Sequence, residues 1–368
     1  MPPTINLLKK LDAAGHEVVF ITIFPCEYLK KMNLSRASNV SLCSRRISFQ
    51  DKVKYTPVLS GFLYRVDTMI KKSIARRLRN VIDEELNKGG KLWIVNEMTV
   101  LLAGAHCIKN HEFAFLIYEL HEDLFYARNI KKVAQKASAV VVPDYFRAHI
   151  MKSRYNLKQL PFVLPNRSDI DFEKMFETER NKKAIEQIKL SKAEGNRILV
   201  YMGGVNQERP LEGLLEAIQR IGSWKLAIIG KPSQYLDELQ REYSECILNL
   251  GAFSPPDHLT IAQFCDIGVL NYVSINKKQG LNAIFCAPNK IYEYTGLGLP
   301  VIGNDIPGLR FCISTSMCGE LVDYDDPSSI ETALNTIVNR YEEYSEAARD
   351  FYRATNTDET LKRIISAV

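Results

Sequence analysis

Strand-sized apolar runs alternate with amphipathic helical segments along nearly all of the sequence, and this alternation restricts the fold more than any other feature. It favours parallel sheets covered by helices. The alternation stops in a charged stretch with few strand patterns, residues 166–196, and then begins again. A chain of 368 residues is long enough for two cores. We therefore predict an α/β protein with two Rossmann-like domains, residues 1–165 and 166–343.

The first domain is expected to contain a helix over residues 5–14 and strands over 17–23, 92–95, 115–118 and 139–142. A Rossmann-like half normally opens on a strand, whereas this one opens on a helix. Loss of a central strand would leave hydrogen-bonding groups of its neighbours unpaired. Either the domain lacks this strand or the true start lies upstream of Met1, and we expect the second.

The second domain is expected to repeat the alternation from residue 198 onward. Asp326 and Pro327 have the residue types typical of an N-cap and a first helical position, and so predict a helix start. The expected strands are 198–203, 225–230, 247–250, 267–271, 301–303 and 320–322, with helices over 210–220 and 235–243.

The longest apolar runs, such as 137–143 and 226–230, are far shorter than the about 18 residues that a membrane-spanning helix needs. Polar residues interrupt any signal-peptide core near the N-terminus. The eight cysteines stand alone, without a CxxC pair or zinc-site spacing. These features predict a protein of the reducing cytoplasm.

Positive charge is concentrated near the N-terminus, where residues 1–80 contain 15 Lys and Arg against 5 Asp and Glu. Residues 65–79 combine an apolar helical face with a dense basic face. A solvated helix surface explains this pattern, and so does peripheral contact with anionic lipid headgroups on the inner face of a membrane. Nucleic acid is not an expected partner, because no RNP-like or helix-turn-helix pattern accompanies the charge.

The densest chemical signal is the segment 287–303, APNKIYEYTGLGLPVIG. It indicates a loop, a short helix that begins near Pro288, a glycine-rich stop and a buried strand. The free N–H groups of a helix start suit phosphate oxygens, and Lys290 adds a positive charge beside them. Glu293 follows one turn later, where its carboxylate can accept hydrogen bonds from a sugar diol. A surface ion pair between Lys290 and Glu293 is the simpler alternative.

Two further segments carry candidate site residues. Gly203 and Gly204 end an expected strand and allow a ligand to approach the backbone closely, and Arg209 follows near the next helix start. A tight turn with a solvent-facing arginine explains that loop equally simply. His121 and Glu122 stand at the end of a first-domain strand, without the HExxH spacing of a zinc protease. A lone histidine is more often structural than catalytic.

The segment around Glu293, Gly298 and Pro300 resembles the donor-site signature of glycosyltransferase family 4, in its capsule and O-antigen variant with Pro-Asn-Lys. This resemblance implies a GT-B fold, donor contacts from Gly203, Gly204, Asn289 and Glu293, and a C-terminal segment, 344–368, that returns to the first domain. It implies that Arg209 and Lys290 neutralise the leaving diphosphate and that His121 faces the donor sugar. The family often has another glutamate at the position of Phe285, and the expected substitute is Asn282 or the loop N–H groups of residues 280–283.

The resemblance implies sugar transfer, with retained configuration, from a nucleotide-diphosphate sugar to a hydroxyl of a saccharide or lipid-linked acceptor. No cofactor or metal is expected. The Asp169-Ile170-Asp171 triplet lies in the linker, so we interpret it as helix capping. Two alternatives stay open: a catalytically silent homologue that serves as a partner subunit, favoured by Phe285, and a nucleotide-sugar epimerase.

Overall fold

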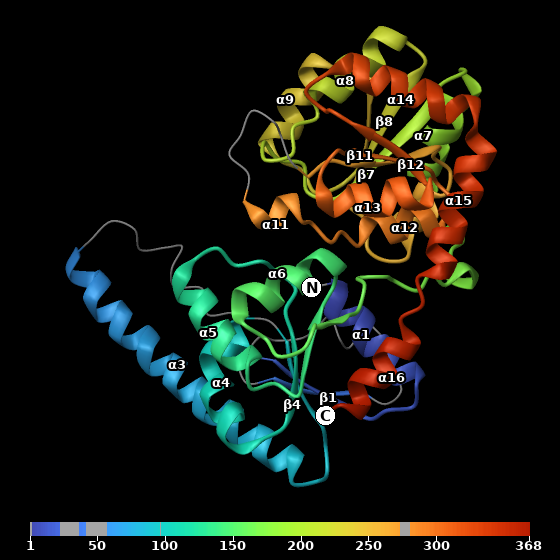
Figure 1. The fold of residues 1–368 in the computed structure, drawn as a ribbon. Coiled ribbons are helices and arrows are strands. Elements are labelled where there is room, and N and C mark those ends of the chain that lie inside the picture. Colours follow the sequence, from blue (N-terminus) through green and yellow to red (C-terminus); the bar gives the residue numbers. More distant parts are fainter. Residues whose placement is uncertain (1, 23–36, 42–56, 96, 273–279) are drawn as a thin grey trace. The chain divides into compact units, whose positions relative to one another are not determined.

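A computed structural model describes residues 2–22, 37–41, 57–95, 97–272 and 280–368. The chain forms two compact units (Figure 1). The first unit comprises Met1–Leu164 and Thr357–Val368, and the second comprises Pro165–Asn356. Both are α/β units with parallel sheets, as the alternation predicted.

Among its described residues, the first unit contains two parallel sheets. The strands β1 (Val18–Thr22) and β2 (Ala37–Ser41) pair with each other, and a second sheet has the order β3-β4-β5-β6. All four residues of β4 are buried, because helices cover both faces of a parallel sheet. The remaining elements are β3 (Leu92–Val95), β4 (Phe113–Leu116), β5 (Ala139–Val142), β6 (Phe162–Val163), α1 (Pro2–Ala13), α3 (Pro57–Leu86), α4 (Glu97–Asn110), α5 (Leu124–Ala134), α6 (Tyr145–Tyr155) and α16 (Asp358–Ser366).

Outside residues 273–279, the second unit contains one six-stranded parallel sheet of order β12-β11-β10-β7-β8-β9. The strands β8 and β9 lie on one side of β7, and the chain then crosses to the other side, where β10, β11 and β12 follow. Its strands are β7 (Arg197–Met202), β8 (Trp224–Ile229), β9 (Ile247–Gly251), β10 (Ile267–Leu270), β11 (Val301–Asn304) and β12 (Gly319–Val322). Its helices are η1 (Phe172–Lys174), α7 (Lys182–Ala193), α8 (Glu212–Ile221), α9 (Gln234–Glu242), α10 (Asp257–Ala262), α11 (Leu281–Ile284), α12 (Lys290–Gly296), α13 (Pro307–Ser316), α14 (Pro327–Asn339) and α15 (Tyr341–Ala354).

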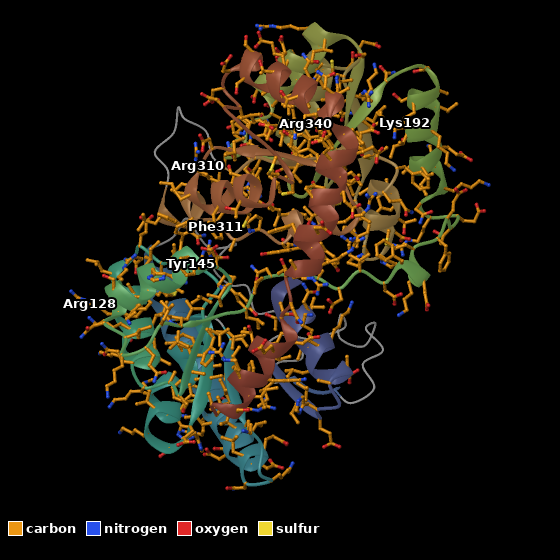
Figure 2. The ribbon with its side chains drawn as sticks, turned by 45° about the vertical axis from the view of Figure 1, so that its right-hand side comes forward. Arg128, Tyr145, Lys192, Arg310, Phe311 and Arg340 are labelled. Atoms are coloured by element: carbon orange, nitrogen blue, oxygen red, sulfur yellow. The ribbon has the colours of Figure 1, made fainter. Side chains whose placement is uncertain are left out.

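One aspartate fastens the amino ends of the central strands. Asp266 Oδ2 accepts a hydrogen bond from the Ile198 N–H at 2.7 Å, and its Oδ1 lies 2.8 Å from Lys192 Nζ on α7 (Figure 2). These contacts leave the carboxyl ends of β7 and β10 at the opposite edge of the sheet, where ligands bind in open parallel α/β folds.

Most expected elements are present within a few residues of their predicted bounds. The helix start at Asp326 is confirmed, because its side chain accepts a hydrogen bond from the Ser328 N–H and Pro327 is the first helical residue. Asp171 stands at the N-cap position of η1, and its carboxylate pairs with Lys174. Asp169 pairs with a neighbouring arginine, Arg167.

Helix α15 packs on the second unit, so the part of the C-terminal segment that lies in the first unit begins at Thr357 rather than at residue 344. The Ser345 hydroxyl donates a 2.7 Å hydrogen bond to the Gly298 carbonyl. The Phe351 ring stacks on Tyr292 of α12 at a centroid distance of 5.6 Å. Through both contacts, α15 packs against α12 and the turn that follows it.

The basic segment 65–79 lies within α3, and the side chains of residues 65–71 are outside the described part of the chain. Lys72, Arg76 and Arg77 are exposed, whereas Leu78 and Ile82 are buried, which agrees with the expected amphipathic helix. Among the described residues, no helix has the length and apolarity that a bilayer crossing requires.

Candidate functional site

The site is centred on a buried carboxylate. Glu293 lies on α12 with only 5% of its surface exposed. A buried charge is costly unless it is paired and hydrogen-bonded, and three side chains surround this one. Asn289 Nδ2 donates to Oε1 at 2.8 Å, and Lys290 Nζ donates to Oε2 at 2.6 Å. His258 Nε2, on α10, lies 3.5 Å from the same Oε2. The Lys290–Glu293 pair is therefore real, but it is not a surface pair.

These neighbours leave Glu293 able to bind a ligand. A carboxylate has about four lone-pair sites, and the described donors use one on Oε1 and two on Oε2. One site on Oε1 remains for a hydroxyl group, and a second becomes available if Asn289 moves. The Lys290 ammonium has three N–H donors, of which one reaches Glu293. The pair can thus accept from a hydroxyl and donate to an anion at the same time.

The charge of Glu293 is stabilised strongly. Burial alone would raise the pKa of its carboxyl, but hydrogen bonding to His258 and the positive charge of Lys290 outweigh burial and lower that pKa to about 2. Glu293 is therefore ionised at neutral pH.

This lowered pKa predicts an acid-sensitive contribution to stability. Because the folded-state pKa lies below the ordinary 4.5, the contribution is complete above pH 4.5 and is lost as the pH falls toward 2. Its size is on the order of 3 kcal/mol. The measurement is the free energy of unfolding, by urea, of the parent and of Glu293→Gln between pH 7 and pH 3. The two curves should converge on the acid side.

The two tryptophans allow each unit to be followed separately, since Trp93 lies in β3 and Trp224 in β8. A Trp93→Phe background makes Trp224 fluorescence the reporter for the second unit. A pH-independent difference between the parent and Glu293→Gln would contradict the assigned cause of the low pKa.

Tyr294, which follows Glu293 on α12, contacts the end of β7 just before the glycine loop. The Met202 N–H at the end of β7 donates a 3.0 Å hydrogen bond to the hydroxyl oxygen of fully buried Tyr294. The Tyr294 ring covers Gly268 of β10, where a Cβ atom would lie 2.4 Å from ring carbons. A larger residue at Gly268 would displace the ring. Tyr294 therefore holds α12 against the sheet, through the carboxyl end of β7 and the Gly268 position of β10.

The glycine loop itself depends on backbone freedom. Gly203 has φ of 147°, a conformation that L side chains rarely adopt. A Cβ atom on Gly230 would lie 2.2 Å from the Gly203 carbonyl oxygen, so the two chain segments pack backbone to backbone. A Cβ atom on Gly204 would meet no atom within 4 Å. The outer side of this loop is open to a ligand.

Arg209 lies where the strand order reverses. It follows β7, and its guanidinium carbon is 4.5 Å above the ring centroid of Tyr272, which follows β10. Asn271 also bridges the two loops, because its amide donates to the Pro210 carbonyl. Burial raises the pKa of Tyr272, so Arg209 faces a neutral ring. The charge of Arg209 is positioned by stacking and needs no carboxylate partner for its orientation.

The structure brings six of the eight predicted site residues to one edge of the second sheet: Gly203, Gly204, Arg209, Asn289, Lys290 and Glu293. Asn282 lies on the short helix α11 in the same unit, half-buried. Phe285 follows that helix, and its backbone packs against Gly308 of α13.

His121 lies in the first unit, in the loop between β4 and α5. It is half-buried and stacks on Tyr126 at a centroid distance of 5.8 Å. Glu122 is exposed, and Asp123 caps α5 by accepting hydrogen bonds from the Phe125 and Tyr126 N–H groups. The acidic residues of this motif thus have different surroundings, and Asp123 has a structural role.

Three contributors were not expected from the sequence: His258, Tyr272 and Asn166. The Asn166 amide donates a 2.9 Å hydrogen bond to the Ala287 carbonyl in the loop that leads to α12. No local pattern marks His258 or Tyr272, because their partners lie far away along the chain.

This geometry can be compared with known proteins. Residues 196–340 match the family model described as "Glycosyl transferases group 1". That segment holds every residue of the carboxylate cluster and the glycine loop. D-inositol 3-phosphate glycosyltransferase of Geodermatophilus obscurus is 25% identical over 196 residues, which are 49% of this chain and 41% of that protein. The match therefore spans less than half of the length of this curated relative.

Solved structures match nearly the whole chain. Anabaena HepE in complex with UDP has a TM-score of 0.69 at 10% identity and covers 100% of this chain and 96% of its own. Sucrose-phosphate synthase from Thermosynechococcus elongatus has a TM-score of 0.66 at 17% identity, covering 99% and 93%. A glycosyltransferase from Rickettsia africae has a TM-score of 0.68 at 14% identity, covering 99% and 92%. The fold is that of the GT-B glycosyltransferases.

Proposed function

We propose that this chain is a glycosyltransferase that moves a sugar from a nucleotide-diphosphate sugar to a hydroxyl group of a saccharide acceptor. The observation that carries the proposal is the buried, cation-paired Glu293 beside an open glycine loop, at the reversal point of a parallel sheet. Ligands of such folds bind at that point. The family match over residues 196–340 supports the assignment.

In this proposal each residue of the site binds one part of the donor. Glu293 accepts a hydrogen bond from the ribose, and Asn289 holds the carboxylate in place. Lys290 uses its remaining N–H donors for the diphosphate. Gly203 and Gly204 let the phosphates approach the backbone. Because the similar HepE fold was crystallised in complex with UDP, uridine nucleotides are the first donors to test.

The chemical step that we propose is same-face substitution with retained configuration. The bond from the anomeric carbon to the diphosphate oxygen breaks while the acceptor hydroxyl attacks, and the departing phosphate takes its proton. Arg209 and Lys290 stabilise the negative charge that develops on the leaving group. Two fixed cations supply the charge that a divalent ion supplies in other transferases, so we propose that transfer needs no metal.

The acceptor side of the proposal rests on the first unit. We propose that His121 faces the reacting sugar, with Asn282 contributing to sugar recognition from the second unit. The acceptor is a lipid-linked saccharide of a surface polysaccharide pathway, reached at the inner face of the membrane. The exposed cations of α3, Lys72, Arg76 and Arg77, support contact with anionic headgroups there.

The test is a thermal-shift series with UDP, GDP and their sugars, followed by transfer assays with lipid-linked acceptors and chelator present. Glycosidic product with the anomeric configuration of the donor is the expected result. Nucleotide binding without turnover would instead indicate the silent homologue that Phe285 favours. Sugar isomerisation without acceptor would indicate an epimerase, and no nucleotide-induced shift would contradict the donor site.

A further inference from the structure

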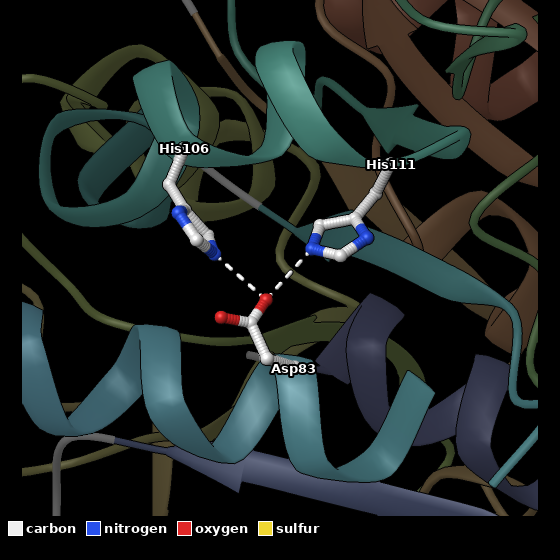
Figure 3. A group of neighbouring side chains, drawn as sticks. All are labelled: Asp83, His106 and His111. Atoms are coloured by element: carbon white, nitrogen blue, oxygen red, sulfur yellow. Dashed lines mark hydrogen bonds and ion pairs between the residues drawn. The ribbon is translucent and has the colours of Figure 1, made fainter. Parts of the chain in front are cut away.

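Two of the six histidines of the chain converge on one aspartate in the first unit, and the proposed sugar transfer uses none of these three residues (Figure 3). His106 Nε2 and His111 Nε2 both lie 2.8 Å from Asp83 Oδ1. The two imidazole rings meet edge to face, with centroids 5.5 Å apart and planes at 64°. All three potential ligand atoms lie within 4.8 Å of one another.

Three separate chain elements bring these side chains together. Asp83 lies near the end of α3, His106 lies on α4, and His111 stands between α4 and the first residue of β4. Buried Leu78 and Ile82 on α3 keep that helix against the unit, so Asp83 is held at its surface edge. The histidine side chains are mostly buried, at 19% and 18% exposed, while Asp83 is 43% exposed. The group is therefore anchored on one side and open to solvent on the other.

The donor set suits a transition metal ion. Two imidazole nitrogens and one carboxylate oxygen are ordinary zinc ligands, and zinc prefers four ligands in a tetrahedron. Zinc bonds of about 2.0–2.1 Å place neighbouring ligand atoms about 3.3 Å apart. The present separations of 2.8 Å from Asp83 Oδ1 need to open by only about half an ångström. The exposed side of Asp83 leaves room for water as the fourth ligand.

The surrounding residues support the ring orientation that a metal requires. Asn110 Nδ2 lies 3.0 Å from His106 Nδ1, the nitrogen that faces away from Asp83. A metal on Nε2 needs the proton on Nδ1, and a flipped Asn110 amide presents its oxygen to accept that proton. Asn110 can therefore orient His106 in both the hydrogen-bonded and the metal-bound state.

We propose that Asp83, His106 and His111 form a zinc-type metal site that fastens α3 and α4 to the start of β4. The site is structural in this proposal. His111 precedes β4, whereas the candidate sugar-facing residue His121 follows it, so the two lie beyond opposite ends of the same strand. The metal site has no role in the proposed sugar transfer, so the two proposals can be tested independently.

The test uses tag-free chain, stripped with chelator and titrated with CoCl2 and then ZnSO4. The parent should take up one ion per chain, with visible cobalt d–d bands and no thiolate charge-transfer band in the near ultraviolet. His106→Gln and His111→Gln should weaken binding by at least about 100-fold, because each removes a ligand rather than a supporting contact. Asn110→Ala should weaken it by about tenfold.

His16→Gln is the matched control, because His16 is an exposed histidine in the turn after α1. It should bind cobalt like the parent. Zinc should raise the unfolding midpoint of the parent and of His16→Gln, but not that of His111→Gln. Circular dichroism of the metal-free variants establishes that they fold, and UDP binding to the second unit should stay within about twofold of the parent.

Two results would overturn the metal site. Absence of uptake by the folded parent, or equal uptake by His111→Gln, would leave the three side chains as a hydrogen-bonded cluster that joins α3 to α4. A thiolate band in the cobalt spectrum would place the ion on a cysteine instead. Loss of transferase activity with metal uptake intact would concern the proposed function and not this site.

Discussion

Glu293→Gln should raise the dissociation constant for UDP about 100-fold while the second unit stays folded. The substitution keeps the size of the side chain and removes the charge that the ribose hydroxyl and Lys290 both use. A hydrogen bond to a charged group contributes about 1.5–3 kcal/mol, and about 1.4 kcal/mol corresponds to a tenfold change in affinity. Glutamine is preferable to alanine, since alanine would also leave a cavity beside Lys290 and His258 and no side-chain oxygen to accept their hydrogen bonds.

The partner of Glu293 on the ligand can be identified by a double-mutant cycle. Calorimetry with UDP, 2′-deoxy-UDP and 3′-deoxy-UDP, each on the parent and on Glu293→Gln, isolates the coupling of the carboxylate with each hydroxyl. We expect coupling with at least one hydroxyl, because one lone-pair site on Oε1 is available among the described contacts. Equal losses for all three nucleotides would mean that Glu293 acts only through Lys290.

The second unit offers a matched control for this variant. Arg340 and Glu343 form an i,i+3 ion pair like that of Lys290 and Glu293, with Nη2 2.6 Å from Oε2, but both side chains are exposed (Figure 2). Exposed pairs contribute little to stability, because water and salt screen them. Glu343→Gln should therefore leave both UDP affinity and stability almost unchanged. Similar effects of the two substitutions would argue against a specific site at Glu293.

The sequence predicted the second unit well because its signals are local. Buried strands there are short apolar runs bounded by glycine or charged residues, and the Asp326-Pro327 helix start is complete within two residues. The spacing of Lys290 and Glu293 likewise requires only a helix. The spacing did not reveal that Glu293 is buried. His258 of α10 contacts Glu293, but it lies 35 residues earlier in the sequence.

Long-range pairing also explains what was missed in the first unit. The edge strand β6 has only two residues, too few for a period-2 pattern. Asp83 lies 23 residues before His106, so no metal-site spacing appears in the sequence, although the folded chain places their side chains 2.8 Å apart. The Arg209–Tyr272 contact depends on β7 and β10 being neighbours, which only the sheet order establishes.

Arg209→Met should lower kcat for sugar transfer by about 10²- to 10³-fold, with less than about a tenfold change in donor affinity. The charge on the leaving diphosphate is larger in the transition state than in the bound donor, so a cation aimed at it acts mainly on kcat. Methionine keeps an apolar stem over the Tyr272 ring and removes the charge together with the planar guanidinium group. The measurement is kcat and KM with saturating acceptor, together with donor affinity by calorimetry.

Two companion variants separate charge from geometry. Arg209→Lys retains the positive charge but loses the planar group that stacks 4.5 Å above Tyr272, so its kcat should lie between those of the parent and Arg209→Met. Arg310→Met is the control, because Arg310 is an exposed arginine of α13 that pairs with Asp305, and its kcat should match the parent (Figure 2). If Arg209→Met raises KM and leaves kcat intact, the guanidinium binds donor and transition state equally, and the charge that stabilises the leaving group must come from Lys290.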